Sequence, residues 1–99
     1  MRIVRRPKFL VDIKDAYDWI APDSEKAAEH LLDRIDATIA RLGQYPLIGA
    51  FRQELAPELR SIRVRPFKHL IFYRVSGNRV VLVRLLHGAQ ALAKQDYEV

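Results

Sequence analysis

The chain has no cysteine among its 99 residues. This absence excludes disulfide bonds, thiolate metal ligands and a cysteine nucleophile, and it is compatible with a reducing compartment. No apolar run reaches the length of a signal-peptide core or of a membrane span. We therefore expect a cytoplasmic protein that has no contact with a membrane.

Negative charge is missing from one long stretch, residues 60–87, which holds seven arginines and lysines, two histidines and no carboxylate. The net charge of the whole chain is +5, yet residues 1–58 hold nine basic and ten acidic side chains. A basic surface attracts nucleic acid or an acidic protein, and charge alone does not separate the two. Because arginine dominates and recurs beside apolar positions, we interpret this stretch as a binding surface rather than a solvated face.

The size and composition indicate one globular domain spanning residues 1–99. The chain is 49% apolar, and it is too short to build the separate hydrophobic cores of two domains. Neither a repeat nor a low-complexity segment interrupts it.

Two amphipathic helices are predicted in the first half. Apolar residues recur at helical spacing after Pro7 and end at Ile20, before Ala21 and Pro22 break the pattern. A second apolar stripe follows and predicts the second helix. Asp23 or Ser24 can cap the start of this helix, and Gly43 is placed to end it. A first strand over residues 2–6 precedes the helices, and a loop over residues 44–57 follows them. We expect the apolar side chains of this loop to turn inward: Tyr45, Leu47, Ile48 and Phe51.

Three strands are predicted in the arginine-rich half, at residues 61–65, 69–75 and 80–86. Residues 76–78 form the hairpin turn between the last two strands, because Gly77 can take a positive φ. If Val75 pairs with Arg79, one face of this hairpin is an apolar groove with two arginines set into it. That face carries Leu70, Phe72, Arg74, Val80, Leu82, Arg84 and Leu86.

The predicted fold class is therefore α+β: an N-terminal strand, an antiparallel helical hairpin, then a three-stranded antiparallel meander. The helices cover one face of the sheet and the second face is open. A short tail over residues 89–99 ends the chain.

This order of elements, together with several short motifs, resembles the RelE/ParE superfamily of bacterial toxins over nearly the whole chain. The motifs are PLIG at residues 46–49, ELRS at 58–61, LIFYR at 70–74 and VRLLHG at 83–88. The resemblance implies a toxin of a type II toxin–antitoxin system. It also implies a cognate ParD-like antitoxin in a hetero-oligomer with the toxin, and operator DNA reached only through that antitoxin.

The superfamily holds two activities on one fold. The RelE-type branch cleaves mRNA on the ribosome with a cluster of basic side chains and, usually, a tyrosine near the C-terminus. In this chain Ser61, Leu70 and Gln90 stand where that branch has basic residues, while Arg63 keeps one basic position and Tyr97 falls close to the tyrosine. The resemblance therefore implies the ParE-type branch, which inhibits DNA gyrase by binding and is not known to be an enzyme.

The alternative is a ribosome-dependent mRNA interferase, for which the candidate catalytic residues are Glu54, Arg63, His87 and Tyr97. A third hypothesis is a module that has lost toxicity and only binds antitoxin. In the preferred interpretation the antitoxin covers the groove, with candidate contacts at Arg60, Arg63, Leu70, Phe72, Arg74, Leu82, Arg84 and Leu86.

Other polar residues have simpler interpretations. Any one of the arginines could pair with a helix carboxylate such as Asp12, Asp15 or Asp33. His87, at the end of an apolar strand, is interpreted as a residue that bonds nearby backbone. The lone histidines His30 and His69 lack metal-ligand spacing, so neither a metal nor another cofactor is expected.

Overall fold

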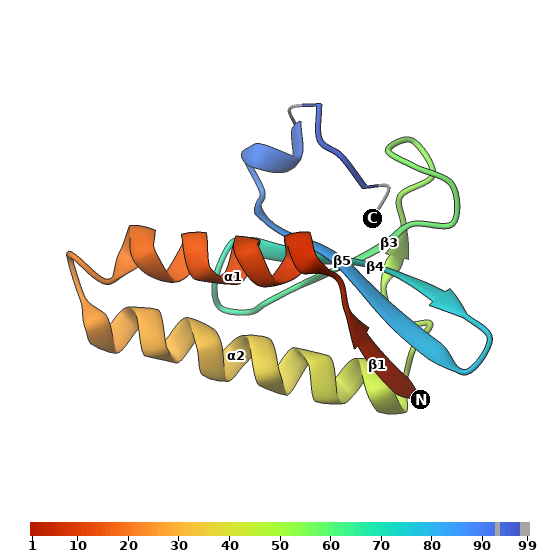
Figure 1. Ribbon diagram of the computed structural model, residues 1–99, viewed down its shortest axis with the longest axis horizontal. Coiled ribbons are helices and arrows are strands. Elements are labelled where there is room, and N and C mark those ends of the chain that lie inside the picture. The colour runs from red at the N-terminus through yellow and green to blue at the C-terminus, as the bar shows by residue number, and fades with distance from the viewer. Residues whose placement is uncertain (93, 98–99) are drawn as a thin grey trace.

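The computed structural model describes residues 1–92 and 94–97 (Figure 1). Residues 93, 98 and 99 of the predicted tail lie outside that part. The predicted α+β class is confirmed, with one further short strand in the loop after the helices. In chain order the elements are β1 (Arg2–Arg5), α1 (Pro7–Ile20), α2 (Glu25–Gln44), β2 (Ala50–Phe51), β3 (Arg60–Arg63), β4 (His69–Ser76), β5 (Arg79–His87) and the 3₁₀ helix η1 (Gln90–Leu92).

The strands form one five-stranded sheet in the order β1-β5-β4-β3-β2. The strands β3, β4 and β5 are the predicted antiparallel meander, and β1 lies parallel to β5 at one edge. At the other edge β2 pairs with only two residues of β3, Ser61 and Arg60. The remainder of β3 is therefore left without a strand on its outer side within the described part of the chain.

The two helices begin and end close to the predicted positions. Pro7 occupies the first turn of α1, where its missing N–H is not needed. The Ser24 hydroxyl caps α2 by accepting the Ala27 N–H at 3.1 Å, and α2 continues one residue past Gly43. Among the described residues, neither helix combines the length and apolar character that crossing a bilayer needs.

The sheet is covered on both faces. The helical hairpin packs on one face, and the C-terminal segment lies on the other (Figure 1). The first core is formed by Phe9, Leu31, Ile35, Ile39, Leu42, Val64, Ile71, Tyr73, Val80, Leu82 and Leu85. The second is formed by Ala56, Leu59, Phe72, Val83, Leu86, Ala91 and Tyr97. The prediction of an open second face is therefore wrong, because residues before β3 and the C-terminal tail cover that face.

The predicted register of the last hairpin is also wrong. Val75 pairs with Val80 rather than Arg79, and the turn is the two residues Gly77 and Asn78, with φ of +60° at Gly77. A one-residue shift exchanges the two faces of a strand, so Val80 and Leu82 point to the helices. An irregularity in the pairing opposite Phe72 and Tyr73 then restores the predicted faces nearer the end of β5.

The loop after α2 is turned outward, contrary to prediction. The Tyr73 hydroxyl accepts the Gly49 N–H and donates to the Pro46 carbonyl, both at 2.8 Å. Arg60 also donates to the Gly49 carbonyl at 2.8 Å, so the loop binds the sheet through its backbone. Its apolar side chains are consequently exposed: Tyr45, Leu47, Ile48 and Phe51.

Candidate functional site

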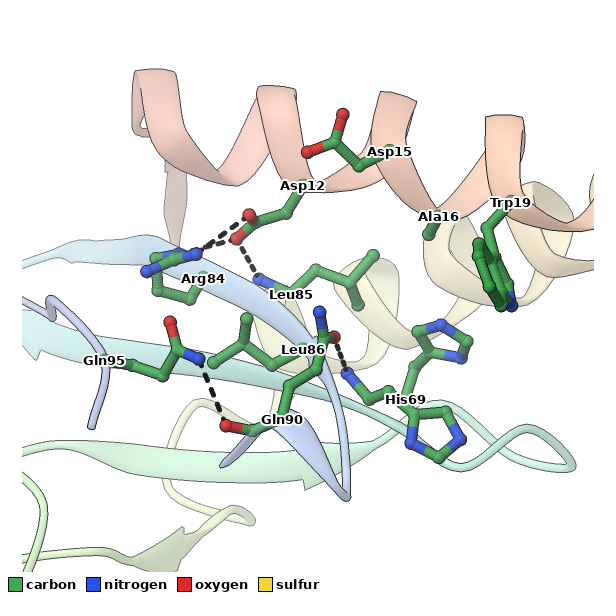
Figure 2. Close-up of a pocket in the computed structure, with 11 residues that line it drawn as sticks. Asp12, Asp15, Ala16, Trp19, His69, Arg84, Leu85, Leu86, Gln90 and Gln95 are labelled. Carbon is green, nitrogen blue, oxygen red and sulfur yellow. Dashed lines mark hydrogen bonds and ion pairs between the residues drawn. The ribbon is translucent and has the colours of Figure 1, made fainter. Parts of the chain in front are cut away.

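A hollow of about 590 Å³ lies between α1 and the C-terminal end of β5 (Figure 2). Asp15 and Trp19 line it from α1, while His69 and His87 line it from the ends of β4 and β5. The Trp19 side chain is 84% exposed at this site, so it does not contribute to the core. Apart from the position of Trp19 off the apolar stripe of α1, no signal in the sequence indicated this hollow.

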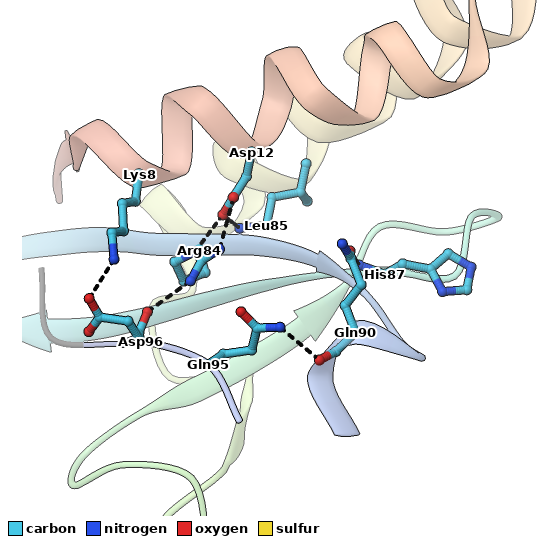
Figure 3. Close-up of polar contacts among 8 residues, drawn as sticks. All are labelled: Lys8, Asp12, Arg84, Leu85, His87, Gln90, Gln95 and Asp96. Carbon is cyan, nitrogen blue, oxygen red and sulfur yellow. Dashed lines mark hydrogen bonds and ion pairs between the residues drawn. The ribbon is translucent and has the colours of Figure 1, made fainter. Parts of the chain in front are cut away.

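Asp12 and Arg84 form the wall of the hollow next to the sheet. The Asp12 carboxylate accepts from Arg84 Nε at 2.7 Å and from Nη2 at 3.0 Å, and it also accepts the Leu85 N–H at 3.0 Å (Figure 3). Both side chains are nearly buried, and the hydrogen bond with Asp12 raises the pKa of Arg84 above its ordinary value. This pair ties α1 to β5 and leaves neither group available for chemistry.

The two histidines meet edge to face, with their ring centroids 5.4 Å apart. Burial lowers the pKa of His69, and the nearby His87 lowers it further because two imidazolium charges repel. The interpretation of His87 as a residue that bonds backbone is confirmed, since its Nδ1 accepts the Ala89 N–H at 3.2 Å. In the described ranges, no group of three or more metal-ligating side chains is placed to hold an ion.

The four candidate nuclease residues each contact different neighbours. Glu54 pairs with Arg52 at 2.8 Å, and Arg63 donates to the Phe67 carbonyl at 2.8 Å. Tyr97 is buried against the Phe72 ring, at a centroid distance of 5.1 Å. His87 contacts Gln90 and Ala89 at the end of β5. These contacts do not bring the four residues together as the acid and base groups of one site.

The four arginines predicted to face a partner also have partners within the chain. Arg84 pairs with Asp12, as the simpler interpretation anticipated for a single arginine. Arg74 donates to the carbonyls of Pro57 at 3.0 Å and Tyr97 at 2.8 Å, and Arg60 donates to carbonyls of the loop after α2. Of the four, Arg84 is thus bound by a helix carboxylate, while Arg60, Arg63 and Arg74 donate to main-chain carbonyls of the chain.

The apolar members of the predicted groove are mostly buried. Leu82 lies in the first core, on the helix side, with none of its surface exposed. Phe72 and Leu86 do lie on the second face, but both are covered there, and only Leu70 remains partly exposed. Their placement as an open groove is therefore wrong: the tail occupies the position that was predicted for a partner.

The tail is held on the second face by several polar contacts. Asp96 pairs with Lys8 of α1, and its carbonyl accepts from Arg84 at 3.0 Å (Figure 3). Gln90 Oε1 accepts the His87 N–H at 2.8 Å, and the Gln90 carbonyl accepts from Gln95 at 3.1 Å. The Tyr97 hydroxyl is buried without a hydrogen-bond partner in the described part of the chain.

A second groove of about 580 Å³ lies between α2 and β3. Four arginines line it: Arg34 and Arg41 from α2, and Arg63 and Arg65 from β3 and the residues after it. Among the described residues, its lining contains no carboxylate. The sequence carries a signal for this groove, because Arg34 and Arg41 are seven residues apart, which places them two turns apart on one face of α2. Of the predicted antitoxin contacts, Arg63 is the one that lies in this groove.

Comparison with known proteins places this structure in a family. Residues 3–92 match the family model described as the ParE toxin of the type II toxin–antitoxin system parDE. The chain belongs to the ParE toxin family. It is 39% identical over 95 residues to Toxin ParE3 of Caulobacter vibrioides, covering 95% of this chain and 93% of that protein.

Solved structures share the ParE fold at lower identity. The chromosomal ParDE system from P. aeruginosa superposes with a TM-score of 0.75 at 20% identity, covering 88% of this chain and 95% of that one. A copper-bound mutant toxin from Helicobacter pylori gives a TM-score of 0.60 at 17% identity, covering 91% and 97% of the two chains. These two likenesses support the fold alone.

Proposed function

We propose that this ParE toxin inhibits DNA gyrase by binding it as a protein ligand, and that a cognate ParD-like antitoxin neutralises it. The family match and the relative named Toxin ParE3 support a toxin of a type II system. The P. aeruginosa structure with this fold belongs to a chromosomal ParDE toxin–antitoxin system. We extend that partnership to this chain, and with gyrase as target we place the protein in the cytoplasm.

One observation favours a protein ligand over an enzyme. Metal-free RNA cleavage needs a base, an acid and cations converging on one phosphate. Here the guanidiniums of Arg60, Arg74 and Arg84 bind groups of their own chain, and the Tyr97 hydroxyl is buried. This arrangement supports action by binding rather than by catalysis.

Two assays run side by side test this proposal. Purified toxin is added to gyrase with relaxed plasmid, and separately to ribosomes translating a defined mRNA. We expect loss of supercoiling, or trapped cleaved DNA, together with intact mRNA. Cut mRNA with unaffected gyrase would contradict the proposal and would return Arg63, His87 and Glu54 to consideration as a nuclease site.

A further inference from the structure

The groove between α2 and β3 concentrates positive charge that the chain itself does not neutralise. Arg34, Arg41, Arg63 and Arg65 line it, and none of them forms an ion pair with a described residue. Guanidiniums that converge without a counter-charge repel one another, so an anion that binds among them relieves this repulsion. The groove is therefore complementary in charge to a strongly anionic ligand.

Two of these arginines are oriented by main-chain carbonyls. Arg34 Nε donates to the Arg65 carbonyl, and Arg63 Nε donates to the Phe67 carbonyl, both at 2.8 Å. The terminal nitrogens of Arg34 and Arg63 make no hydrogen bond with a described residue. Because one nitrogen of each guanidinium is already fixed, less side-chain freedom is lost when the terminal nitrogens bind the oxygens of a ligand.

The charge and the size of the groove favour a short chain of phosphates. Guanidinium groups bind phosphate oxygens in pairs, and a terminal phosphate brings roughly −1.5 to −2 charges and three acceptor oxygens. Arg34 and Arg41 lie about 10 Å apart along the axis of α2, which is further than a single phosphate extends. The groove, at about 580 Å³, also has the volume of a small-molecule site rather than of a single-ion site.

The lining of the groove offers little that could recognise a base. Its apolar contacts come from Ala37, Ile48 and Ile62, and among the described residues no aromatic side chain lines it. Unpaired bases are held mainly by stacking on aromatic side chains. A nucleotide in this groove is therefore held by its phosphates, whatever its base.

Carboxylates outside the groove disfavour a long nucleic acid. Asp33 and Asp36 are exposed on α2 and do not line the groove. A DNA or RNA strand that crosses α2 brings its phosphates towards these carboxylates, and like charges repel. A short phosphate chain stays among the arginines and avoids this repulsion.

We infer that the groove between α2 and β3 binds a short chain of phosphates, free or carried by a nucleoside triphosphate, through the guanidiniums of Arg34, Arg41, Arg63 and Arg65. This inference is independent of the proposed function, since neither gyrase inhibition nor neutralisation requires it. It assigns the toxin a small anionic ligand. Because that ligand neutralises the repulsion among the arginines, it stabilises the folded toxin.

The test measures the affinity of the toxin for inorganic triphosphate by isothermal titration calorimetry in magnesium-free buffer. The variant is Arg41→Gln with Arg65→Gln, because both side chains are exposed. We expect its dissociation constant to rise about 30-fold or more, since two charge-assisted contacts are lost. No measurable binding to the wild type would overturn the inference.

The matched control is Arg2→Gln with Arg79→Gln, which removes the same charge from two exposed, neighbouring arginines of β1 and β5. We expect its dissociation constant to change about threefold or less, because distant surface charges are screened. An equal loss of affinity in the two double variants would overturn the inference, since net charge alone would then account for the binding.

Nucleotides and a nucleic-acid strand test which part of a ligand is recognised. ATP and UTP should bind within about threefold of inorganic triphosphate, because no aromatic side chain holds the base. A labelled oligothymidine strand, followed by fluorescence anisotropy, should bind more weakly and equally to both double variants. A strong preference for one base, or tight strand binding that only the groove variant loses, would overturn the inference.

A further measurement uses the wild-type toxin, so it does not depend on the folding of a variant. In NMR spectra the Nε–H signals of Arg34 and Arg63 should shift as triphosphate is added, whereas that of Arg84, which is bound to Asp12, should not. The temperature of unfolding should also rise with triphosphate concentration, because the site exists only in the folded state. Unmoved signals of Arg34 and Arg63 would overturn the inference.

Discussion

Asp12 of α1 holds Arg84 of β5 with both oxygens of its carboxylate, at 2.7 and 3.0 Å. The same carboxylate accepts the Leu85 N–H, so one side chain of the helix satisfies three donors of the strand. Only 12% of the Arg84 side chain and 10% of the Asp12 side chain are exposed. An arginine that looked like part of a binding surface is instead a structural tie between the helical hairpin and the sheet.

Replacing Asp12 with alanine should strongly destabilise the protein. The change leaves the Arg84 guanidinium nearly buried without its counter-charge, and we expect the free energy of unfolding to fall by about 3 kcal/mol. Urea denaturation followed by circular dichroism measures this. Asp15→Ala is the matched control, because this carboxylate of α1 is exposed and should change stability by about 0.5 kcal/mol or less.

A double-mutant cycle separates the pair from its surroundings. Arg84→Ala should cost less in the Asp12→Ala background than in the wild type, because the interaction is already lost. Additive costs would show that the two residues stabilise the fold independently, contrary to the structure.

Tyr73→Phe should loosen the loop after α2. The substitution leaves the Gly49 N–H and the Pro46 carbonyl without their partner, and we expect a loss of about 1–2 kcal/mol in urea denaturation. Gly49→Ala should also destabilise, because a Cβ there would lie 2.4 Å from the Tyr73 hydroxyl oxygen. Tyr45→Phe, in the exposed part of the same loop, is the control, and an equal loss there would argue against the role of Tyr73.

Tyr97→Phe should make the protein more stable. The Tyr97 hydroxyl is buried without a partner among the described residues, and removing it relieves a desolvation cost of about 1 kcal/mol. Thermal unfolding measures the gain. Tyr97→Ala should do the opposite, because it also removes the ring that packs on Phe72. A loss of stability in Tyr97→Phe would mean that the hydroxyl makes a stabilising contact, contrary to this account.

His69 should make stability fall at mildly acidic pH. The folded state lowers the pKa of His69 below its ordinary value of 6.5, so the unfolded chain takes up this proton first as the pH falls. The free energy of unfolding therefore declines as the pH drops below about 6.5, and the decline ends below the folded-state pKa. His69→Gln should remove this part of the pH dependence in urea titrations.

The neighbouring histidine provides an independent check of that prediction. His87→Asn removes one source of repulsion, so the pKa of His69, followed by NMR, should rise towards 6.5. A pKa of His69 that falls or does not move would contradict the assigned contribution of His87.

The local signals in the sequence predicted most of the fold. Pro7 and Ser24 marked the helix starts, and Gly77 marked the hairpin turn, because each acts on the backbone of its immediate neighbours. The extra β2 strand and the irregularity opposite Phe72 had no such signal, since both depend on how neighbouring strands pair across the sheet. That irregularity decided which side chains of β5 face the helices.

The candidate site was harder to predict because its contacts are distant in the sequence. Arg74 is bound by a carbonyl of the tail, and Arg60 by carbonyls of the loop after α2. Charge patterns reveal the arginines but give no information on main-chain partners. Likewise, nothing in Phe72 itself indicated that Tyr97 would cover it.

The most direct measurement of the central claim is gyrase supercoiling as a function of toxin concentration, with the antitoxin added afterwards. We predict that relaxed plasmid stays relaxed as toxin increases, and that stoichiometric antitoxin restores supercoiling. Full supercoiling at a large excess of folded toxin would contradict gyrase as the target of this ParE protein.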